Sequence, residues 1–74
     1  MQITLNGDPF PVSGPLTVAE LLAQLAIDAR SVAIERNFVV IKRAHYATTA
    51  VAEGDQIEIV NFVGGGGYGL TTVK

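Results

Sequence analysis

The chain has 74 residues, 49% of them hydrophobic and 16% charged, which fits one small folded domain and excludes a disordered chain. Five basic and seven acidic residues give a net charge of −2, which argues against a nucleic-acid binder. With no cysteine and one histidine, His45, the sequence offers neither a thiolate nucleophile nor a metal-ligand set, so we expect a protein that is not an enzyme.

The first predicted element is a β-hairpin. Ile3 and Leu5 alternate with polar residues, which is typical of a strand with one buried face. Asn6-Gly7 follows, and both residue types accept the positive φ angles of a type I′ turn. The returning strand would carry Phe10 and Val12. Because Pro9 and Pro11 cannot donate ladder hydrogen bonds, this strand is expected to lie at a sheet edge or to pair through its other side.

A helix is predicted next. Thr17 and Glu20 have the spacing of a capping box, which satisfies amide groups in the first helical turn. The apolar residues that follow recur at helical spacing and form one stripe: Val18, Leu21, Leu22 and Leu25. The polar segment 28–31 marks the exit from the helix.

Two short β-branched runs, 32–35 and 38–41, predict a second pair of strands joined by a tight turn at Arg36-Asn37. We expect Phe38 and Tyr46 to pack in the core or at a sheet edge. The segment 43–46 is compatible with a short helical turn, and its basic neighbourhood is interpreted as a solvated loop: Lys42, Arg43 and His45.

The clearest predicted strand spans residues 56–63. Alternation puts Ile57 and Ile59 on one face and Glu58, Val60 and Phe62 on the other. Two interpretations of the second face remain open. A bulge or the twist of the sheet could return Val60 and Phe62 to the core, or they could form an exposed apolar patch for docking.

Together these elements predict an α+β fold, in which a mixed sheet of four or five strands is covered on one face by one main helix. The ubiquitin-like β-grasp roll has this element order. The domain is predicted over residues 1–63, followed by a glycine tail at 64–67 and a carboxyl-terminal extension at 68–74.

The glycine run allows three interpretations. Gly64, Gly66 and Gly69 match G-x-G-x-x-G, but the helix and βαβ unit that a nucleotide site needs do not follow. The run could be a passive flexible linker. It could also be a reactive tail, because backbone without side chains can enter a narrow channel in a partner enzyme. Four extended glycines would reach about 13–14 Å.

The chain resembles the ThiS family of sulfur carriers over residues 1–66. The similarity lies in the order and spacing of several segments: Ile3-Thr4-Leu5-Asn6-Gly7, Thr17-Val18-Ala19-Glu20-Leu21-Leu22, Val32-Ala33-Ile34-Glu35 followed by Asn37, Gly54-Asp55-Gln56-Ile57-Glu58-Ile59-Val60, and Phe62-Val63-Gly64-Gly65-Gly66. The stretch Val40–Tyr46 is similar too, but it lacks the family's proline and tryptophan.

This resemblance implies a carrier for thiazole formation in thiamine biosynthesis. In the family, a ThiF-type adenylyltransferase uses ATP to adenylate the terminal glycine carboxylate. Sulfur from a persulfide donor then displaces AMP, and thiazole synthase accepts the sulfur of the resulting thiocarboxylate. The carrier itself binds no cofactor or metal. Carried over to this sequence, the modified residue is Gly66 or Gly67, and the partner-binding residues are Val60, Phe62, Val63, Gly64 and Gly65.

The chain departs from the family because residues 68–74 follow the glycines, and an internal glycine carbonyl is an amide that cannot be adenylated. Trimming by a peptidase after Gly66 or Gly67 is our hypothesis. Cloning sequence or a degenerate extension are the alternatives for these seven residues. The usual three-glycine ending favours Gly66, whereas the end of the run favours Gly67.

Two other functions stay open at this point. A β-grasp interaction module with a passive tail would explain the extension, and a MoaD-like molybdopterin carrier shares the chemistry. The start of the chain lacks a targeting signal, and no stretch approaches the ~20 apolar residues that span a bilayer. We therefore expect a cytoplasmic protein that binds neither membrane nor nucleic acid.

Overall fold

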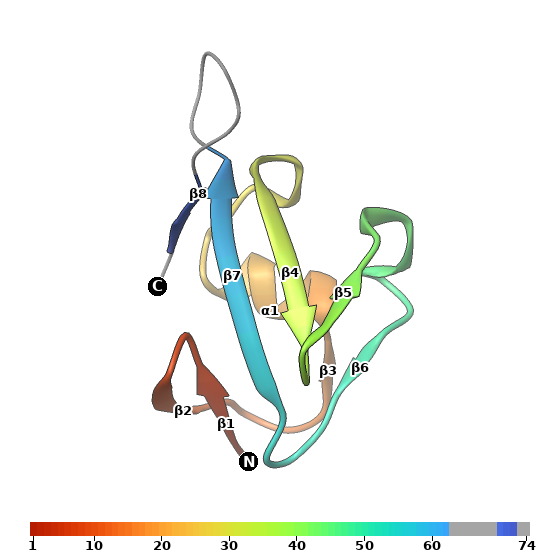
Figure 1. Cartoon of the computed structure of the whole chain (residues 1–74). Coiled ribbons are helices and arrows are strands. Elements are labelled where there is room, and N and C mark those ends of the chain that lie inside the picture. The colour runs from red at the N-terminus through yellow and green to blue at the C-terminus, as the bar shows by residue number, and fades with distance from the viewer. Residues whose placement is uncertain (63–69, 73–74) are drawn as a thin grey trace.

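The computed structural model describes residues 1–62 and 70–72. Figure 1 shows the order of its elements along the chain. These are β1 (Gln2–Leu5), β2 (Asp8–Pro11), β3 (Leu16–Thr17), α1 (Val18–Gln24), η1 (Ala29–Ser31), β4 (Val32–Arg36), β5 (Val39–Ile41), η2 (Arg43–His45), β6 (Ala50–Val51), β7 (Gln56–Phe62) and β8 (Leu70–Thr72).

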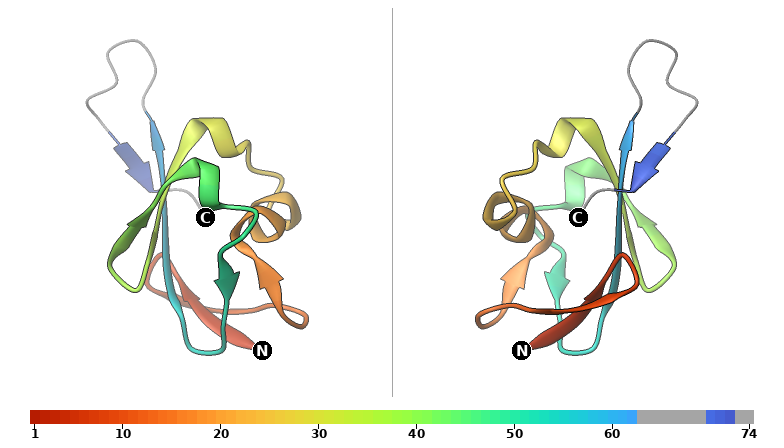
Figure 2. Two further views of the ribbon diagram at one scale, coloured as in Figure 1. Left: turned by 90° about the vertical axis from the view of Figure 1, so that its right-hand side faces the viewer. Right: turned by 90° about the vertical axis from the view of Figure 1, so that its left-hand side faces the viewer.

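The strands form a mixed sheet in the order β2-β1-β7-β4-β5, and β8 pairs with β7 outside this path. β1 and β7 run parallel, whereas the other neighbouring strands are antiparallel. Figure 2 shows the sheet edge-on, with α1 on one side together with the small β3–β6 pair. The predicted α+β architecture, a β-grasp sheet covered on one face by one helix, is confirmed.

The first hairpin forms as its sequence predicts. Asn6 and Gly7 both have positive φ, +48° and +87°, as a type I′ turn requires. β2 lies at the edge of the sheet, where its prolines interrupt no ladder to a further strand. The strand ends at Pro11, one residue earlier than predicted, and Val12 enters the core.

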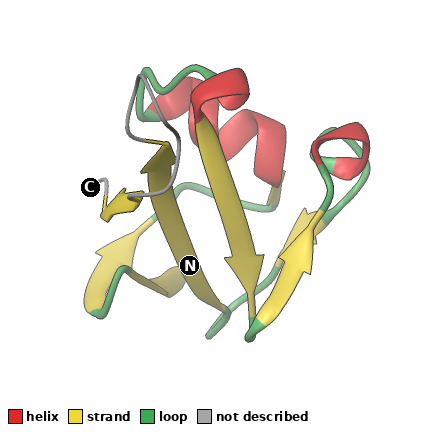
Figure 3. Ribbon diagram, turned by 45° about the horizontal axis from the view of Figure 1, so that its top comes forward, coloured by secondary structure: helices red, strands yellow, loops and turns green. Residues whose placement is uncertain are grey.

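Helix α1 begins at the predicted capping box. The Thr17 amide donates to the Glu20 carboxylate at 2.8 Å, and the Glu20 amide donates to the Thr17 hydroxyl at 3.1 Å. The helix ends at Gln24, and Ala26 then adopts φ +58° without a glycine. The polar exit also continues as a further turn, because η1 lies at residues 29–31 (Figure 3).

The core lies between α1 and the covered face of the sheet. Alternate residues of the three central strands are buried, as the period of two predicts: Ile3, Leu5, Val32, Ile34, Ile57 and Ile59. The helix contributes Val18, Leu21 and Leu22, while Leu25 is half-buried. Within residues 1–62 and 70–72, no helix is both long and apolar enough to cross a membrane.

The second hairpin differs from the prediction by one residue. Arg36 belongs to β4, and the turn is formed by Asn37 and Phe38, with φ of +53° and +70°. Phe38 is 77% exposed, so its predicted packing in the core or at an edge is wrong. Tyr46 is buried as expected, and its hydroxyl donates to the Val32 carbonyl at 3.4 Å.

Candidate functional site

Strand β7 carries the predicted site and lies at the centre of the sheet. On one side it pairs with β4 over five consecutive residue pairs, from Val32 opposite Asn61 to Arg36 opposite Ile57. On the other side it pairs with β1 only at Gln56 and Ile57. Beyond Ile57, the same edge of β7 is covered first by a side chain and then by a second strand.

The side chain is that of Asn6, in the turn after β1. Its amide nitrogen Nδ2 donates to the Ile59 carbonyl at 3.1 Å, and its Oδ1 accepts from the Ile59 amide at 2.7 Å. Asn6 thus satisfies both backbone groups of a fully buried residue where β1 no longer reaches. The sequence pattern identified Asn6 only as a turn residue. The signal for this second role is the short length of β1, which ends one residue before Asn6 and leaves the rest of the β7 edge uncovered.

A polar network fixes the start of β7. The buried Asp55 carboxylate accepts hydrogen bonds from Arg36 Nε at 2.7 Å, the Ala52 amide at 2.8 Å and Asn37 Nδ2 at 3.1 Å. The Gln56 amide donates to Asn37 Oδ1 at 2.9 Å. Burial acts to raise the pKa of Asp55, but the hydrogen bonds from Ala52, Asn37 and Arg36 outweigh it and leave this pKa lowered.

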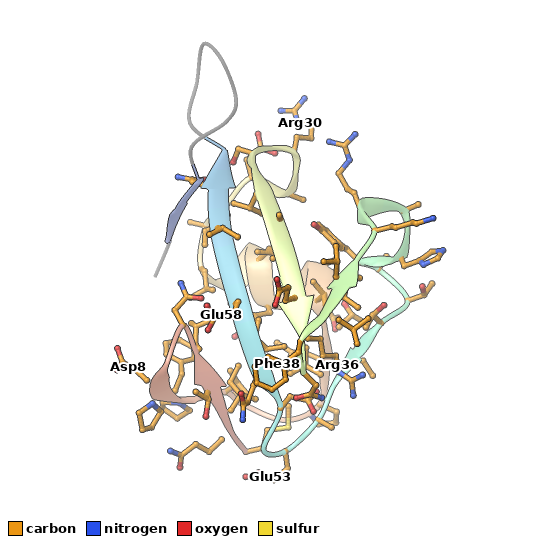
Figure 4. All side chains as sticks on the ribbon, in the orientation of Figure 1. Asp8, Arg30, Arg36, Phe38, Glu53 and Glu58 are labelled. Carbon is orange, nitrogen blue, oxygen red and sulfur yellow. The ribbon has the colours of Figure 1, made fainter. Side chains whose placement is uncertain are left out.

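The face of the sheet opposite α1 combines carboxylates with apolar residues. Glu35 and Glu58 lie directly opposite each other on β4 and β7, and Val40 lies opposite Glu35 on β5. In the next row, Ala33 lies opposite Val60. Val40 is 66% exposed, and Figure 4 labels Glu58 on this face. Like charges in directly opposed positions destabilise a sheet, so this acidic pair is not explained by folding.

Val60 is half-buried and lies on this outer face. The β4–β7 register runs without interruption through Asn61, so no bulge returns Val60 to the core. Of the two interpretations left open by the sequence, the structure therefore supports the one in which Val60 faces away from the helix. Its role in partner binding stays a prediction.

The remaining predicted site residues lie largely outside the described part of the chain. Phe62 pairs with Leu70 through its backbone, but its side chain is not among those described. Val63, Gly64, Gly65, Gly66 and Gly67 are outside the described residues. The last described residue before them, Phe62, lies at the end of β7, the strand that Asn6 and the Asp55 network hold in place.

The described side chains bring together no recognisable catalytic set. A hollow of about 310 Å³ beside β4 is lined in part by Arg30, Arg43 and Tyr46. Its lining contains neither a carboxylate nor a histidine. Lys42 and His45 are exposed, as expected for a solvated loop. No three His, Asp or Glu residues in segments 1–62 and 70–72 are placed to hold a metal ion. The end of β7 therefore remains the candidate functional site.

Comparison with known proteins is consistent with this geometry. A sequence model of the ThiS family matches residues 3–66. A protein named thiazole synthase from Paramagnetospirillum magneticum is 44% identical over 66 residues, which are 89% of this chain and 20% of that protein. A second thiazole synthase, from Magnetococcus marinus, is 42% identical over the same lengths. The chain thus spans one fifth of these two relatives.

In two further comparisons, the match covers most of the other protein. Sulfur carrier protein ThiS of Bacillus subtilis is 40% identical over 50 residues, which are 68% of this chain and 76% of that protein. The crystal structure of the thiamine biosynthesis protein ThiS from Geobacter metallireducens superposes with a TM-score of 0.79 at 40% identity. This match covers 89% of the present chain and 100% of the other.

Proposed function

Since the chain belongs to the ThiS family, we propose that it is a sulfur carrier protein for thiazole formation in thiamine biosynthesis. The observation that carries this proposal is the family match over residues 3–66, which includes the whole of β7 and the first three glycines. The likeness to a sulfur carrier protein from Bacillus subtilis supports it. We place the protein in the cytoplasm.

The proposed chemistry takes place on the main chain. The carboxylate of a terminal glycine attacks the α-phosphorus of ATP on a ThiF-type adenylyltransferase, and pyrophosphate leaves. The terminal sulfur of a persulfide donor then attacks the acyl carbon, and AMP leaves. A thiol cleaves the remaining sulfur–sulfur bond, which forms a disulfide and releases the thiocarboxylate. The carrier acts as a co-substrate in these steps, and the ATP is bound by the adenylyltransferase.

This chemistry requires a free carboxylate at Gly66 or Gly67. The sequence continues to Lys74, so this proposal includes a processing peptidase that cuts after Gly66 or Gly67 before activation. The family match ends at residue 66, which supports Gly66 as the new terminus.

We propose the outer face of β7 as the surface that docks on the partners, with Val60 at its described end and Phe62, Val63, Gly64 and Gly65 continuing it. Thiazole synthase is the proposed acceptor of the sulfur. Two relatives named thiazole synthase contain a segment that matches this chain, which supports a working association between carrier and synthase.

The test compares three forms of the protein: the chain ending at Gly66, the chain ending at Gly67, and the full sequence to Lys74. Each is incubated with a ThiF-type enzyme, ATP and a persulfide donor, and ATP–pyrophosphate exchange and intact mass are measured. A trimmed form should support exchange and gain the mass that replaces one oxygen by sulfur. A matched control ends at the same glycine as a carboxamide and should be inert. Absence of exchange with both trimmed forms would favour a β-grasp interaction module with a passive tail.

A further inference from the structure

One edge of β7 is covered by three different groups along its length: β1, the Asn6 side chain and β8. The Thr4 amide donates to the Asp55 carbonyl and the Asn6 amide donates to the Ile57 carbonyl, both at 2.9 Å. The Asn6 side chain then binds both backbone groups of Ile59. The carbonyls of Asp55 and Ile57 and both backbone groups of Ile59 are therefore directed toward this edge, so odd-numbered residues of β7 face it.

The next residue in this series is Asn61, and β8 lies opposite it. The register pairs Val60 with Thr72, Asn61 with Thr71, and Phe62 with Leu70. Residues that face each other in an antiparallel ladder alternate between pairs that exchange hydrogen bonds and pairs that do not. Because Asn61 directs its backbone groups toward this edge, Asn61 and Thr71 form the hydrogen-bonded pair. The backbone groups of Thr72 point away from β7.

We propose that the edge of β7 from Val60 to Phe62 is a strand-binding site, and that β8 of the same chain occupies it until the chain is cut after Gly66 or Gly67. Once vacated, the edge offers the backbone groups of Asn61 to an extended segment of a partner protein, a recurring mode of peptide recognition. An unpaired edge of this kind otherwise invites unspecific pairing, so its cover by β8 protects the unprocessed chain.

The pairing has a consequence for the carrier, and this step rests on the proposed function. β8 holds Leu70 within one strand spacing of Phe62, so the seven residues 63–69 connect two neighbouring points. Neighbouring strands lie ~4.8 Å apart. Removal of β8 therefore does more than create a carboxylate, because it also removes the restraint that keeps Leu70 beside Phe62.

Occupation of the site depends on the covalent link. Three residue pairs contribute little binding energy by themselves, but a short linker gives β8 an effective concentration in the millimolar range. Closing a connection of seven residues carries only a modest entropic cost. After cleavage the released segment is diluted, and the edge becomes free for a partner.

The test is amide hydrogen exchange on the full chain, with no activating enzyme present, so its failure leaves the sulfur-carrier proposal untouched. Thr71→Pro removes the Thr71 amide, which the register directs to the Asn61 carbonyl. The weakened pair should open more often and expose the Asn61 amide, whose exchange should accelerate roughly tenfold. Thr72→Pro is the matched control, because the Thr72 amide points away from β7 and its loss should leave the Asn61 amide protected. The Val60 amide faces β4 and should stay protected in both variants.

Truncation after Gly67 should accelerate exchange at Asn61 as Thr71→Pro does. A synthetic peptide of residues 68–74 should restore protection to the truncated chain at about millimolar concentration. Equal exchange at Asn61 in the wild type and in Thr71→Pro would overturn the proposal, as would equal effects of the two proline variants. Failure of the peptide to protect the truncated chain would show that the edge is not a strand-binding site.

Discussion

Replacing Asn6 by glycine should destabilise the domain even though glycine suits the backbone of the turn better. Asn6 has φ +48°, a conformation that glycine adopts without strain. The substitution therefore removes only the side-chain amide, which donates to the Ile59 carbonyl and accepts from the Ile59 amide. Ile59 is fully buried, so water cannot replace these two partners.

The expected loss follows from the two hydrogen bonds. Each is worth roughly 0.5–1.5 kcal/mol net, so the free energy of unfolding should fall by about 1–3 kcal/mol. Asn6→Ala should cost about 1–2 kcal/mol more, because alanine must also adopt the left-handed conformation. Gly7→Ala measures this strain alone, since Gly7 has φ +87° and no atom lies within 4 Å of the added Cβ.

Urea unfolding followed by far-UV circular dichroism provides the free energies of unfolding for the wild type and the three variants. In a domain of this size, 1 kcal/mol corresponds to a shift of roughly 4–8 °C in Tm, so thermal melts offer an independent check. If Asn6→Gly were as stable as the wild type, the Asn6 side chain would not anchor β7, and the reasoning would be refuted. A cost for Asn6→Ala equal to that of Gly7→Ala would lead to the same conclusion.

Three further predictions concern the rest of the sheet. Phe38→Gly should raise Tm, with a gain of about 1 kcal/mol, because it relieves a left-handed phenylalanine that is 77% exposed; a lower Tm would show that its ring packs in solution. The lowered pKa of Asp55 means that its stabilising effect is present above its unfolded pKa, near 3.8, and is lost as pH falls through the folded value. Asp55→Asn should therefore cost roughly 2–4 kcal/mol at neutral pH and flatten the acid dependence of urea unfolding, whereas a parallel pH profile would contradict this origin. Glu58→Lys should stabilise by roughly 0.2–1 kcal/mol by removing repulsion from Glu35, and the gain measured by thermal melts should shrink at high salt.

The parts of the fold that the sequence predicts are those with local causes. The Asn6-Gly7 turn and the Thr17–Glu20 capping box depend on residues within four positions of one another, and both form as expected. The β3–β6 pair was missed because its two strands have two residues each and lie far apart in the chain. Such a short pairing leaves no periodic pattern to detect.

The shift of the second hairpin has a long-range cause. Local preference argues against a left-handed phenylalanine, so the sequence favours a turn that ends before Phe38. In the structure the Asn37 side chain binds Asp55 and the Gln56 amide, 18 and 19 residues away. These contacts hold Asn37 at the first position of the turn rather than the second, and Phe38 then takes the second position. Hydrogen bonds to distant residues thus override the local preference.

The candidate site was predictable in part. Alternation along β7 left two places open for Val60, the core or the outer face, and the uninterrupted register decides for the outer face. The pairing of β8 was not predicted, because Leu70–Thr72 is too short to show alternation and follows a glycine run that is typical of a linker. The roles of Phe62, Val63 and the glycines depend on partner proteins, which sequence periodicity does not encode.

The anchoring of β7 protects the register of the strand that leads to the glycine run. A slip by one residue would exchange the two faces of the strand, bury Glu58 and expose Ile57 and Ile59. It would also move the residues after Phe62 by one strand rise, about 3.3 Å, relative to the surface that docks on a partner. Asn6 and the Asp55 network hold β7 at two points of its length, so both errors are opposed by the same contacts. Variants that weaken either anchor should therefore lose stability and, if the proposed function holds, accuracy in the placement of the proposed carboxyl-terminal glycine.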